Sequence, residues 1–172
     1  MPLPESTRIA HAHLQVRDLD VALDFYSGAL GLQVIDRQSN TARLSGSGQP
    51  PHLLQLTALP GATAKPARTT GLYHAAIRLP TRMALARLFY RLVTLRVPFQ
   101  GFADHLVSEA LYLADPDDNG LELYRDRPRD QWPRHGDQID MATDPLDYQA
   151  LLAEGIHAVE DWHGIDPGVD IG

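Results

Sequence analysis

Side chains able to hold a metal ion recur at matching places in two segments of the chain. The first segment opens at His11 and the second at His74, and Gln55 and Glu122 stand at the matching later ends. Two imidazoles and one carboxylate on one face leave open coordination positions, an arrangement associated with non-heme Fe(II) oxygenases. The repeat therefore predicts one divalent metal ion held by His11, His74 and Glu122.

The histidines could instead have a structural role, because a single histidine on a strand is more often structural than a metal ligand. The repeat reverses that preference, and an inward Glu122 between outward leucines requires a compensating charge. His13 shares the face of His11, so it stays open as a rival ligand or as a group supporting one. Gln55 stays open too, although an amide oxygen is the poorer ligand.

The elements that must position these residues follow the same repeat. Each half opens with an alternating strand, continues with an amphipathic helix capped by Asp18 or Thr81, and ends with three short strands. Those strands are expected at Leu32 to Asp36, Thr41 to Leu44 and His52 to Thr57, then at Phe99 to Val107, Glu109 to Ala114 and Leu121 to Tyr124. The pattern predicts an α+β fold in which paired βαβββ modules form a curved mixed sheet around a concave metal site.

This organisation sets the expected domain limits. Module 1 covers about residues 9–58 and module 2 about 72–126, inside a domain spanning 1–128, and the stretch at 59–70 is a linker rich in Pro, Gly, Ala and Thr. A C-terminal tail at 129–172 is expected to hold a helix at about 145–162, capped by Asp144. That helix packs on a partner in a homodimer or on its own sheet.

Composition narrows the class of partner. The chain has 172 residues, 44% of them hydrophobic, and a net charge of -7 without a basic block, which argues against nucleic acid. It has no cysteine, which leaves His, Asp, Glu, Tyr and Ser for chemistry. It opens without a signal-peptide pattern, and no apolar run approaches the roughly 18 residues of a membrane span. We expect a cytoplasmic protein that binds a small molecule and no membrane.

Several motifs resemble a known family. They are the opening segment from His11 to Gly31, the run Gly71 to Pro80, the run Asp104 to Asp117 and the run Asn119 to Tyr124. Together they resemble the catechol 2,3-dioxygenase-like members of the vicinal-oxygen-chelate superfamily, which also includes glyoxalase I, bleomycin-resistance proteins and fosfomycin-modifying enzymes. Two departures stand out: Asp118 replaces the usual turn glycine, and members of this subgroup usually carry two such domains. The run from Trp162 to Gly172 resembles the linker to their second domain.

The resemblance implies an extradiol dioxygenase that opens a catechol ring with O2. It implies Fe(II), or Mn(II) or another first-row ion, at His11, His74 and Glu122. It also places His105 as an acid/base histidine and Tyr112 as a substrate-facing tyrosine, roles that suit the chemistry of both side chains.

Two other functions remain open on the same scaffold. One is a non-oxidative metal enzyme, such as a glyoxalase-like lyase or isomerase, in which the metal stabilises an enediolate. Gln55 argues against glyoxalase I itself, which usually has a carboxylate in that corner. The other is a metal-free binding protein of the resistance type, because fold does not fix function.

Overall fold

The computed structural model describes residues 4, 7–64, 66, 69–156 and 162–172. Module 1 contains β1 (Ala12–Val16), α1 (Leu19–Leu23), a π-helix η1 (Asp24–Ala29), β2 (Gln33–Arg37), β3 (Thr41–Ser45) and β4 (Leu54–Ala58). Module 2 contains β5 (Ala75–Arg78), α2 (Arg82–Thr94), β6 (Phe99–Asp104), β7 (Ser108–Ala114) and β8 (Gly120–Asp126). The expected pair of βαβββ modules and the α+β class are confirmed.

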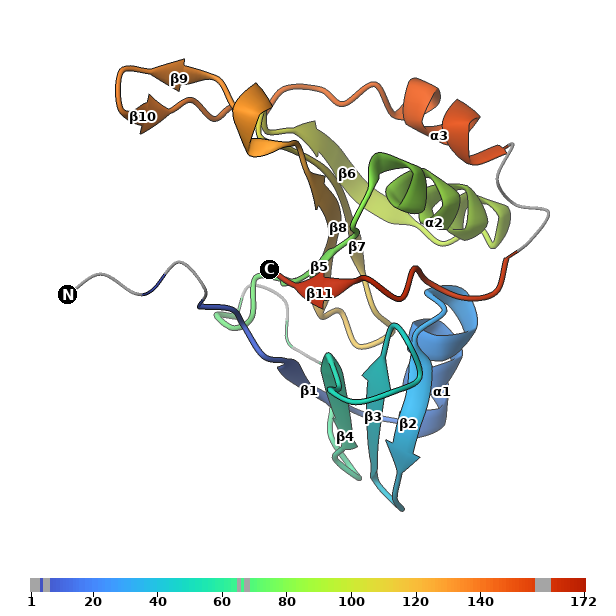
Figure 1. Ribbon diagram of the computed structural model, residues 1–172. Helices are drawn as coiled ribbons and strands as arrows, with labels where there is room; N and C mark the ends of the chain where they lie inside the picture. The colour runs from blue at the N-terminus through green and yellow to red at the C-terminus, as the bar shows by residue number, and fades with distance from the viewer. Residues whose placement is uncertain (1–3, 5–6, 65, 67–68, 157–161) are drawn as a thin grey trace.

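The modules form two sheets, which lie apart in Figure 1. Module 1 has the strand order β1-β4-β3-β2, and module 2 has the order β11-β5-β8-β7-β6, where β11 is the tail strand Asp170–Ile171. In each module the first strand runs parallel to the last and the remaining pairings inside the module are antiparallel. The tail strand pairs antiparallel with β5 and covers the edge of the second sheet.

The helices of the two modules begin where the capping residues predict. Asp18 Oδ1 accepts from the backbone N–H of Asp20 at 2.8 Å, and Thr81 Oγ1 accepts from the N–H of Ala84 at 3.0 Å. The first helix widens into η1 and ends at Gly31, whose φ of +84° favours glycine. None of the helices in the described part of the chain is long and apolar enough to cross a membrane.

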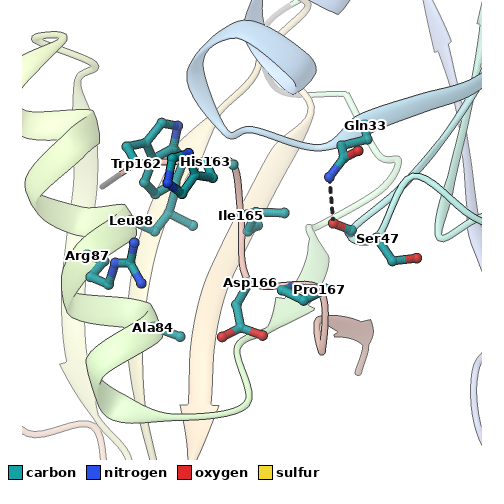
Figure 2. Close-up of a pocket in the computed structure, with 12 residues that line it drawn as sticks. Gln33, Ser47, Ala84, Arg87, Leu88, Trp162, His163, Ile165, Asp166 and Pro167 are labelled. Carbon is teal, nitrogen blue, oxygen red and sulfur yellow. Dashed lines mark hydrogen bonds between the residues drawn. The ribbon is translucent and has the colours of Figure 1, made fainter. Parts of the chain in front are cut away.

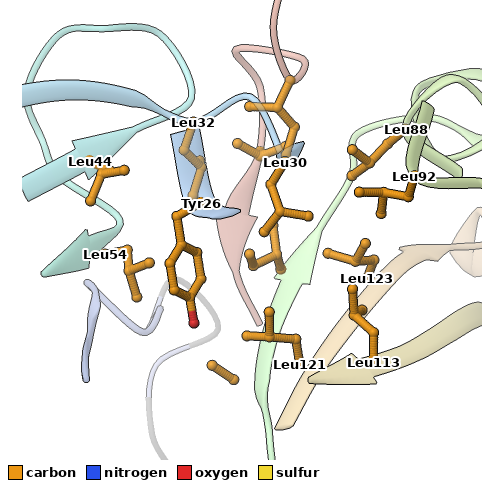
Figure 3. Close-up of a cluster of buried hydrophobic side chains, with 14 of the residues drawn as sticks. Tyr26, Leu30, Leu32, Leu44, Leu54, Leu88, Leu92, Leu113, Leu121 and Leu123 are labelled. Atoms are coloured by element: carbon orange, nitrogen blue, oxygen red, sulfur yellow. The ribbon is translucent and has the colours of Figure 1, made fainter. Parts of the chain in front are cut away.

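One hydrophobic core runs through both modules (Figure 3). From module 1 it takes the fully buried Tyr26 and Leu30, and from module 2 it takes leucines of α2 together with Leu121 and Leu123 of β8. Because side chains alternate along a strand, Glu122 between these two leucines faces the opposite side of the sheet. The candidate site and the core thus occupy opposite faces of module 2.

The tail adds η2 (Arg129–Gln131), β9 (Arg134–His135), β10 (Gln138–Ile139) and α3 (Tyr148–Ile156). The expected start and cap of the tail helix are corrected. Asp144 exchanges two backbone hydrogen bonds with Asp104 and stays extended, so the helix begins later, where Asp147 Oδ1 accepts from the N–H of Ala150 at 3.0 Å. The expected continuation to 162 crosses residues 157–161, which lie outside the described residues.

The tail helix packs on α2 of its own chain, and the two helices approach closely at Gly155. A Cβ there would lie 2.2 Å from the carbonyl oxygen of Ala86 and 2.8 Å from Cβ of Tyr90. We expect Gly155→Ala to destabilise the protein by about 1–3 kcal/mol in urea unfolding, because α3 must move away from α2. Gly101→Ala is the matched control, since nothing lies within 4 Å of its added Cβ. Equal stabilities of the two variants would contradict the prediction.

Candidate active site

Four polar side chains of module 2 form a connected chain on the face opposite the core. His74 Nε2 lies 3.0 Å from Glu122 Oε2, and the Tyr112 hydroxyl donates to Glu122 Oε1 at 2.9 Å. His105 Nε2 lies 2.8 Å from the Tyr112 hydroxyl. These are four of the five side chains singled out from the sequence for metal binding or catalysis.

The register of the second sheet brings these residues together. Glu122 on β8 stands directly opposite Tyr112 on β7 and pairs with Ala76 on β5. The strand β8 begins at Gly120, where a Cβ would lie only 2.1 Å from the carbonyl oxygen of Tyr73. Glycine therefore allows β8 to approach the residue just before His74, which places imidazole and carboxylate within reach of each other.

The hydrogen bonds indicate which atoms of these four side chains carry protons. Burial, followed by the hydrogen bond to Glu122 and its charge, raises the pKa of Tyr112 well above its ordinary value, so its hydroxyl stays protonated. Because the Tyr112 hydroxyl donates its hydrogen bond to Glu122, its oxygen can accept a hydrogen bond from His105 Nε2. His105 Nδ1 lies 2.7 Å from the carbonyl oxygen of Ala142, which can only accept. The contacts to Ala142 and Tyr112 thus hold the His105 ring from both of its nitrogens.

A turn supported by an ion pair holds His105. The Asp104 carboxylate accepts hydrogen bonds from both terminal nitrogens of Arg127, at 2.6 and 2.8 Å. It also accepts from the backbone N–H of Leu106 at 2.9 Å. This contact stabilises Leu106 at a φ of +67°, which is uncommon for a leucine. Sequence reasoning missed Asp104 and Arg127, although an Asp directly before the candidate histidine is the kind of residue that caps a tight turn.

The Asp104 pair makes the turn sensitive to acid. The hydrogen bond from Arg127 lowers the pKa of Asp104 below its ordinary value, so ionised Asp104 stabilises the fold above the pKa of the unfolded chain. That contribution is lost as pH falls through the lowered pKa, below about 4. We expect Asp104→Asn to be less stable than wild type at pH 7 by urea unfolding, and the gap to narrow as the pH falls below about 4. A gap independent of pH would contradict this origin.

The fifth predicted residue, His11, lies elsewhere. It is exposed just before β1, and its ring lies against His52 with centroids 4.5 Å apart. Across the residues that the structure describes, no group of three His, Asp or Glu side chains could hold a metal ion. The structure therefore brings His74 and Glu122 together without His11, and the full triad stays a prediction.

The two modules are nevertheless equivalent in register. Gln55 pairs with His13 in module 1 as Glu122 pairs with Ala76 in module 2, and each predicted histidine ligand lies two positions before that partner. The equivalence inferred from the repeat is therefore present in the backbone. What differs is the environment, because the sheets of the two modules are separate.

A cavity of about 650 Å³ opens between the modules beside His74. It is lined by Ile9, Ala12, His13, Leu14, Gln15, Leu72, His74, Ala75, Ala76, Asn119, Ile171 and Gly172. We call it the intermodule cavity. Its volume is in the range typical of small-molecule sites, and one of its walls is formed by His74 and the start of β5.

A second cavity, of about 380 Å³, lies on the helix side of module 2 (Figure 2). Side chains of α2, including Arg87 and Leu88, form one wall, and tail residues such as Trp162 and Asp166 form another. None of the residues predicted for metal binding or catalysis lines this cavity. The intermodule cavity is therefore the better candidate for a substrate.

Comparison with known proteins identifies the family to which the chain is similar. A family model described as the Glyoxalase/Bleomycin resistance protein/Dioxygenase superfamily matches residues 8–123. A relative named catechol-2,3-dioxygenase, from Bacillus subtilis (strain 168), is 43% identical over 153 residues, which cover 87% of this chain and 53% of that protein. The chain thus spans about half the length of this relative.

Solved structures support the same fold. A glyoxalase/dioxygenase from Nostoc punctiforme superposes with a TM-score of 0.60 at 18% identity, covering 74% of this chain and 97% of that one. A lactoylglutathione lyase from Agrobacterium tumefaciens gives 0.55 at 19% identity, covering 71% and 96%. At these identities the similarity establishes the fold alone.

Proposed function

The chain belongs to the glyoxalase/bleomycin resistance protein/dioxygenase superfamily, and from this premise we propose that it is a metal-dependent extradiol dioxygenase for a catechol or related aromatic diol. The observation that carries the proposal is its 43% identity to a protein named catechol-2,3-dioxygenase. Because this chain spans about half of that relative, the relative's substrate and use of O2 are part of the proposal.

The proposed metal ligands are His11, His74 and Glu122, with Fe(II) as the first candidate and Mn(II) or another first-row ion as alternatives. In kind, an imidazole and a carboxylate fit such an ion. Glu122 lies on the strand β8, which holds it more rigidly than a loop would, and His74 lies directly before β5. Completing the set requires His11 to leave the ring of His52. A bound metal would supply Lewis-acid and redox chemistry for opening the ring beside its two hydroxyls.

The remaining residues of the chain have proposed roles in proton movement. Tyr112 orients Glu122 through its hydrogen bond, and His105, held beside Tyr112, is the acid/base group for a proton of the diol. The carbonyl oxygen of Ala142 fixes the orientation of the His105 ring. The aliphatic residues that line the intermodule cavity, such as Ile9 and Leu72, are suited to contact an aromatic ring.

Metal content and oxygen uptake test this function. Protein purified without chelator should contain one metal ion per chain by elemental analysis, and should consume O2 when catechol is added. His11→Ala, His74→Ala and Glu122→Ala should each lose the ion, whereas the exposed His135→Ala is the control that keeps it. Retention of the full ion content in His11→Ala would remove His11 from the site.

A second candidate is a metal-free small-molecule binding protein. It is favoured by one observation, that His11 does not join His74 and Glu122 among the described residues. Under this alternative the purified protein contains no ion but still binds diols in calorimetry. Metal content with oxygen uptake would exclude it.

A further inference from the structure

A buried carboxylate on the helix side of module 2 gathers arginines from separate elements. Glu109 on β7 is 4% exposed, and it accepts hydrogen bonds from Arg82 of α2 at 2.9 Å and from Arg125 of β8 at 2.7 Å. Arg127 Nη2 lies 3.6 Å from the same carboxylate. Arg82 also pairs with Glu154 of the tail helix. We call these residues the Glu109 cluster.

The Glu109 cluster lies across the sheet from the candidate active site. Side chains alternate along β7, so Glu109 shares its face with the core residue Leu111, whereas Tyr112 faces the opposite side. Among the described residues that line the intermodule cavity, none belongs to the cluster. An effect of the cluster on a substrate in that cavity must therefore pass through other residues.

Arg127 joins the cluster to the turn that carries His105. Its terminal nitrogens donate to both oxygens of Asp104, and its Nη1 also lies 3.4 Å from the carbonyl oxygen of Ser108. The same carbonyl accepts from the backbone N–H of His105 at 2.9 Å. The backbone N–H of Arg127 donates to the carbonyl oxygen of Val107 at 2.7 Å. Arg127 thus holds both ends of the turn between β6 and β7.

The tail supports this turn from the outer edge of the sheet. Asp144 pairs through its backbone with Asp104 at the end of the edge strand β6, and the carbonyl oxygen of Ala142 lies 2.7 Å from His105 Nδ1. Leu106, at the centre of the turn, has a positive φ that persists only where the surroundings stabilise it. The Asp104 carboxylate provides that support, and Arg127 holds the carboxylate in place.

We infer that Arg127 is a positioning residue for His105, and that Glu109 holds Arg127 from the opposite face of the sheet. Arg127 fixes the turn, and the turn fixes where the His105 ring lies relative to Tyr112. A small displacement of an acid/base group slows proton transfer strongly, so the rate depends on this support. The acid/base role of His105 rests on the proposed function, whereas the support of the turn does not.

Two neighbouring lysine substitutions test this role. Arg127→Lys keeps a positive charge near Glu109 but loses the planar fork that reaches both oxygens of Asp104. Arg125→Lys makes the same change at a residue that donates to Glu109 and to the Asp126 carbonyl oxygen. With catechol, we expect Arg127→Lys to lower kcat about tenfold at nearly constant KM, and Arg125→Lys to keep kcat within about twofold. Equal losses of kcat in the two variants would overturn the inference.

Hydrogen exchange measures the turn without metal or turnover. In Arg127→Lys, the backbone N–H groups of His105 and Leu106 should exchange about tenfold faster than in the wild type, because the turn opens locally. Arg125→Lys should leave both rates unchanged. The N–H of Leu111, on the central strand β7, is the reference that corrects for any change in global stability. Wild-type rates at His105 and Leu106 in Arg127→Lys would overturn the inference whatever the activity.

Glu109→Gln tests the member of the cluster farthest from the site. It removes the charge that holds Arg127, so it should lower kcat, and the double variant with Arg127→Lys should be no slower than the slower single variant. Additive losses would show that Glu109 does not act through Arg127. If Glu109→Gln fails to fold, the comparison of Arg127→Lys with Arg125→Lys still decides the role of Arg127.

Failure of the proposed function has a different signature. In that case the wild type itself does not turn over catechol, and hydrogen exchange alone decides the inference. Faster exchange at His105 and Leu106 confined to Arg127→Lys would support the positioning of His105 in a protein that is not a dioxygenase. Equal exchange in Arg127→Lys and Arg125→Lys would overturn it.

Discussion

Glu122→Gln will lower kcat/KM for a catechol by a factor on the order of 1,000 and will deplete the purified protein of its metal ion. Glu122 is mostly buried, with 13% of its side chain exposed, and lies between the imidazole of His74 and the hydroxyl of Tyr112. The amide has the same shape but no charge, and one end becomes a donor, so it satisfies neither a cation nor both neighbours. Oxygen uptake and elemental analysis measure the two effects.

A matched control lies on the same strand. Asp126 ends β8 and pairs with Arg78 at 3.1 Å, away from the His74 contact, so Asp126→Asn removes a carboxylate without touching the candidate site. It should keep its metal and most of its activity. A Glu122→Gln protein with full metal content, or equal losses in both variants, would show that Glu122 is not a ligand.

Asp115→Ala will destabilise the protein by about 3–5 kcal/mol, the largest stability effect that we expect. Asp115 is 5% exposed and accepts from the Tyr26 hydroxyl at 2.9 Å. It also accepts at 2.8 Å from the N–H groups of Asp117 and Asn119, and at 2.9 Å from the Asn119 side chain. The alanine leaves the buried hydroxyl and the donors of the turn without their acceptor. Urea unfolding measures the loss.

Two further variants separate the parts of this effect. Tyr26→Phe deletes one of the four hydrogen bonds, and should cost about 1–3 kcal/mol. Asp118, in the same turn, has a φ of +60°, so Asp118→Gly relieves an uncommon backbone conformation and should change stability by less than about 1 kcal/mol. An Asp115→Ala protein no less stable than Tyr26→Phe would mean that the backbone of the turn needs no side-chain acceptor.

The features that could be predicted from the sequence depend on local patterns. Alternation fixed which residues of β8 face the core, and therefore placed Glu122 on the side of His74 and Tyr112. The caps at Asp18 and Thr81 were predictable because a side-chain oxygen satisfies backbone donors only a few residues away. The positive φ of Asp118 agrees with its place where the turn usually has a glycine.

Features that depend on distant contacts could not be predicted in this way. The separation of His11 from His74 reflects how two modules dock, and that docking is decided by core residues spread over the whole chain. The backbone pairing of Asp144 with Asp104, which delays the tail helix, joins segments far apart in sequence.

The core that passes through both modules has a consequence for attempts to divide the protein (Figure 3). A duplicated chain suggests two halves that could be cut apart and studied alone. Here the Tyr26 hydroxyl of the first half donates a hydrogen bond to Asp115 of the second, and leucines of both halves belong to one core. An excised half would expose this hydrophobic surface to water and aggregate. The two repeated modules therefore form a single cooperative folding unit.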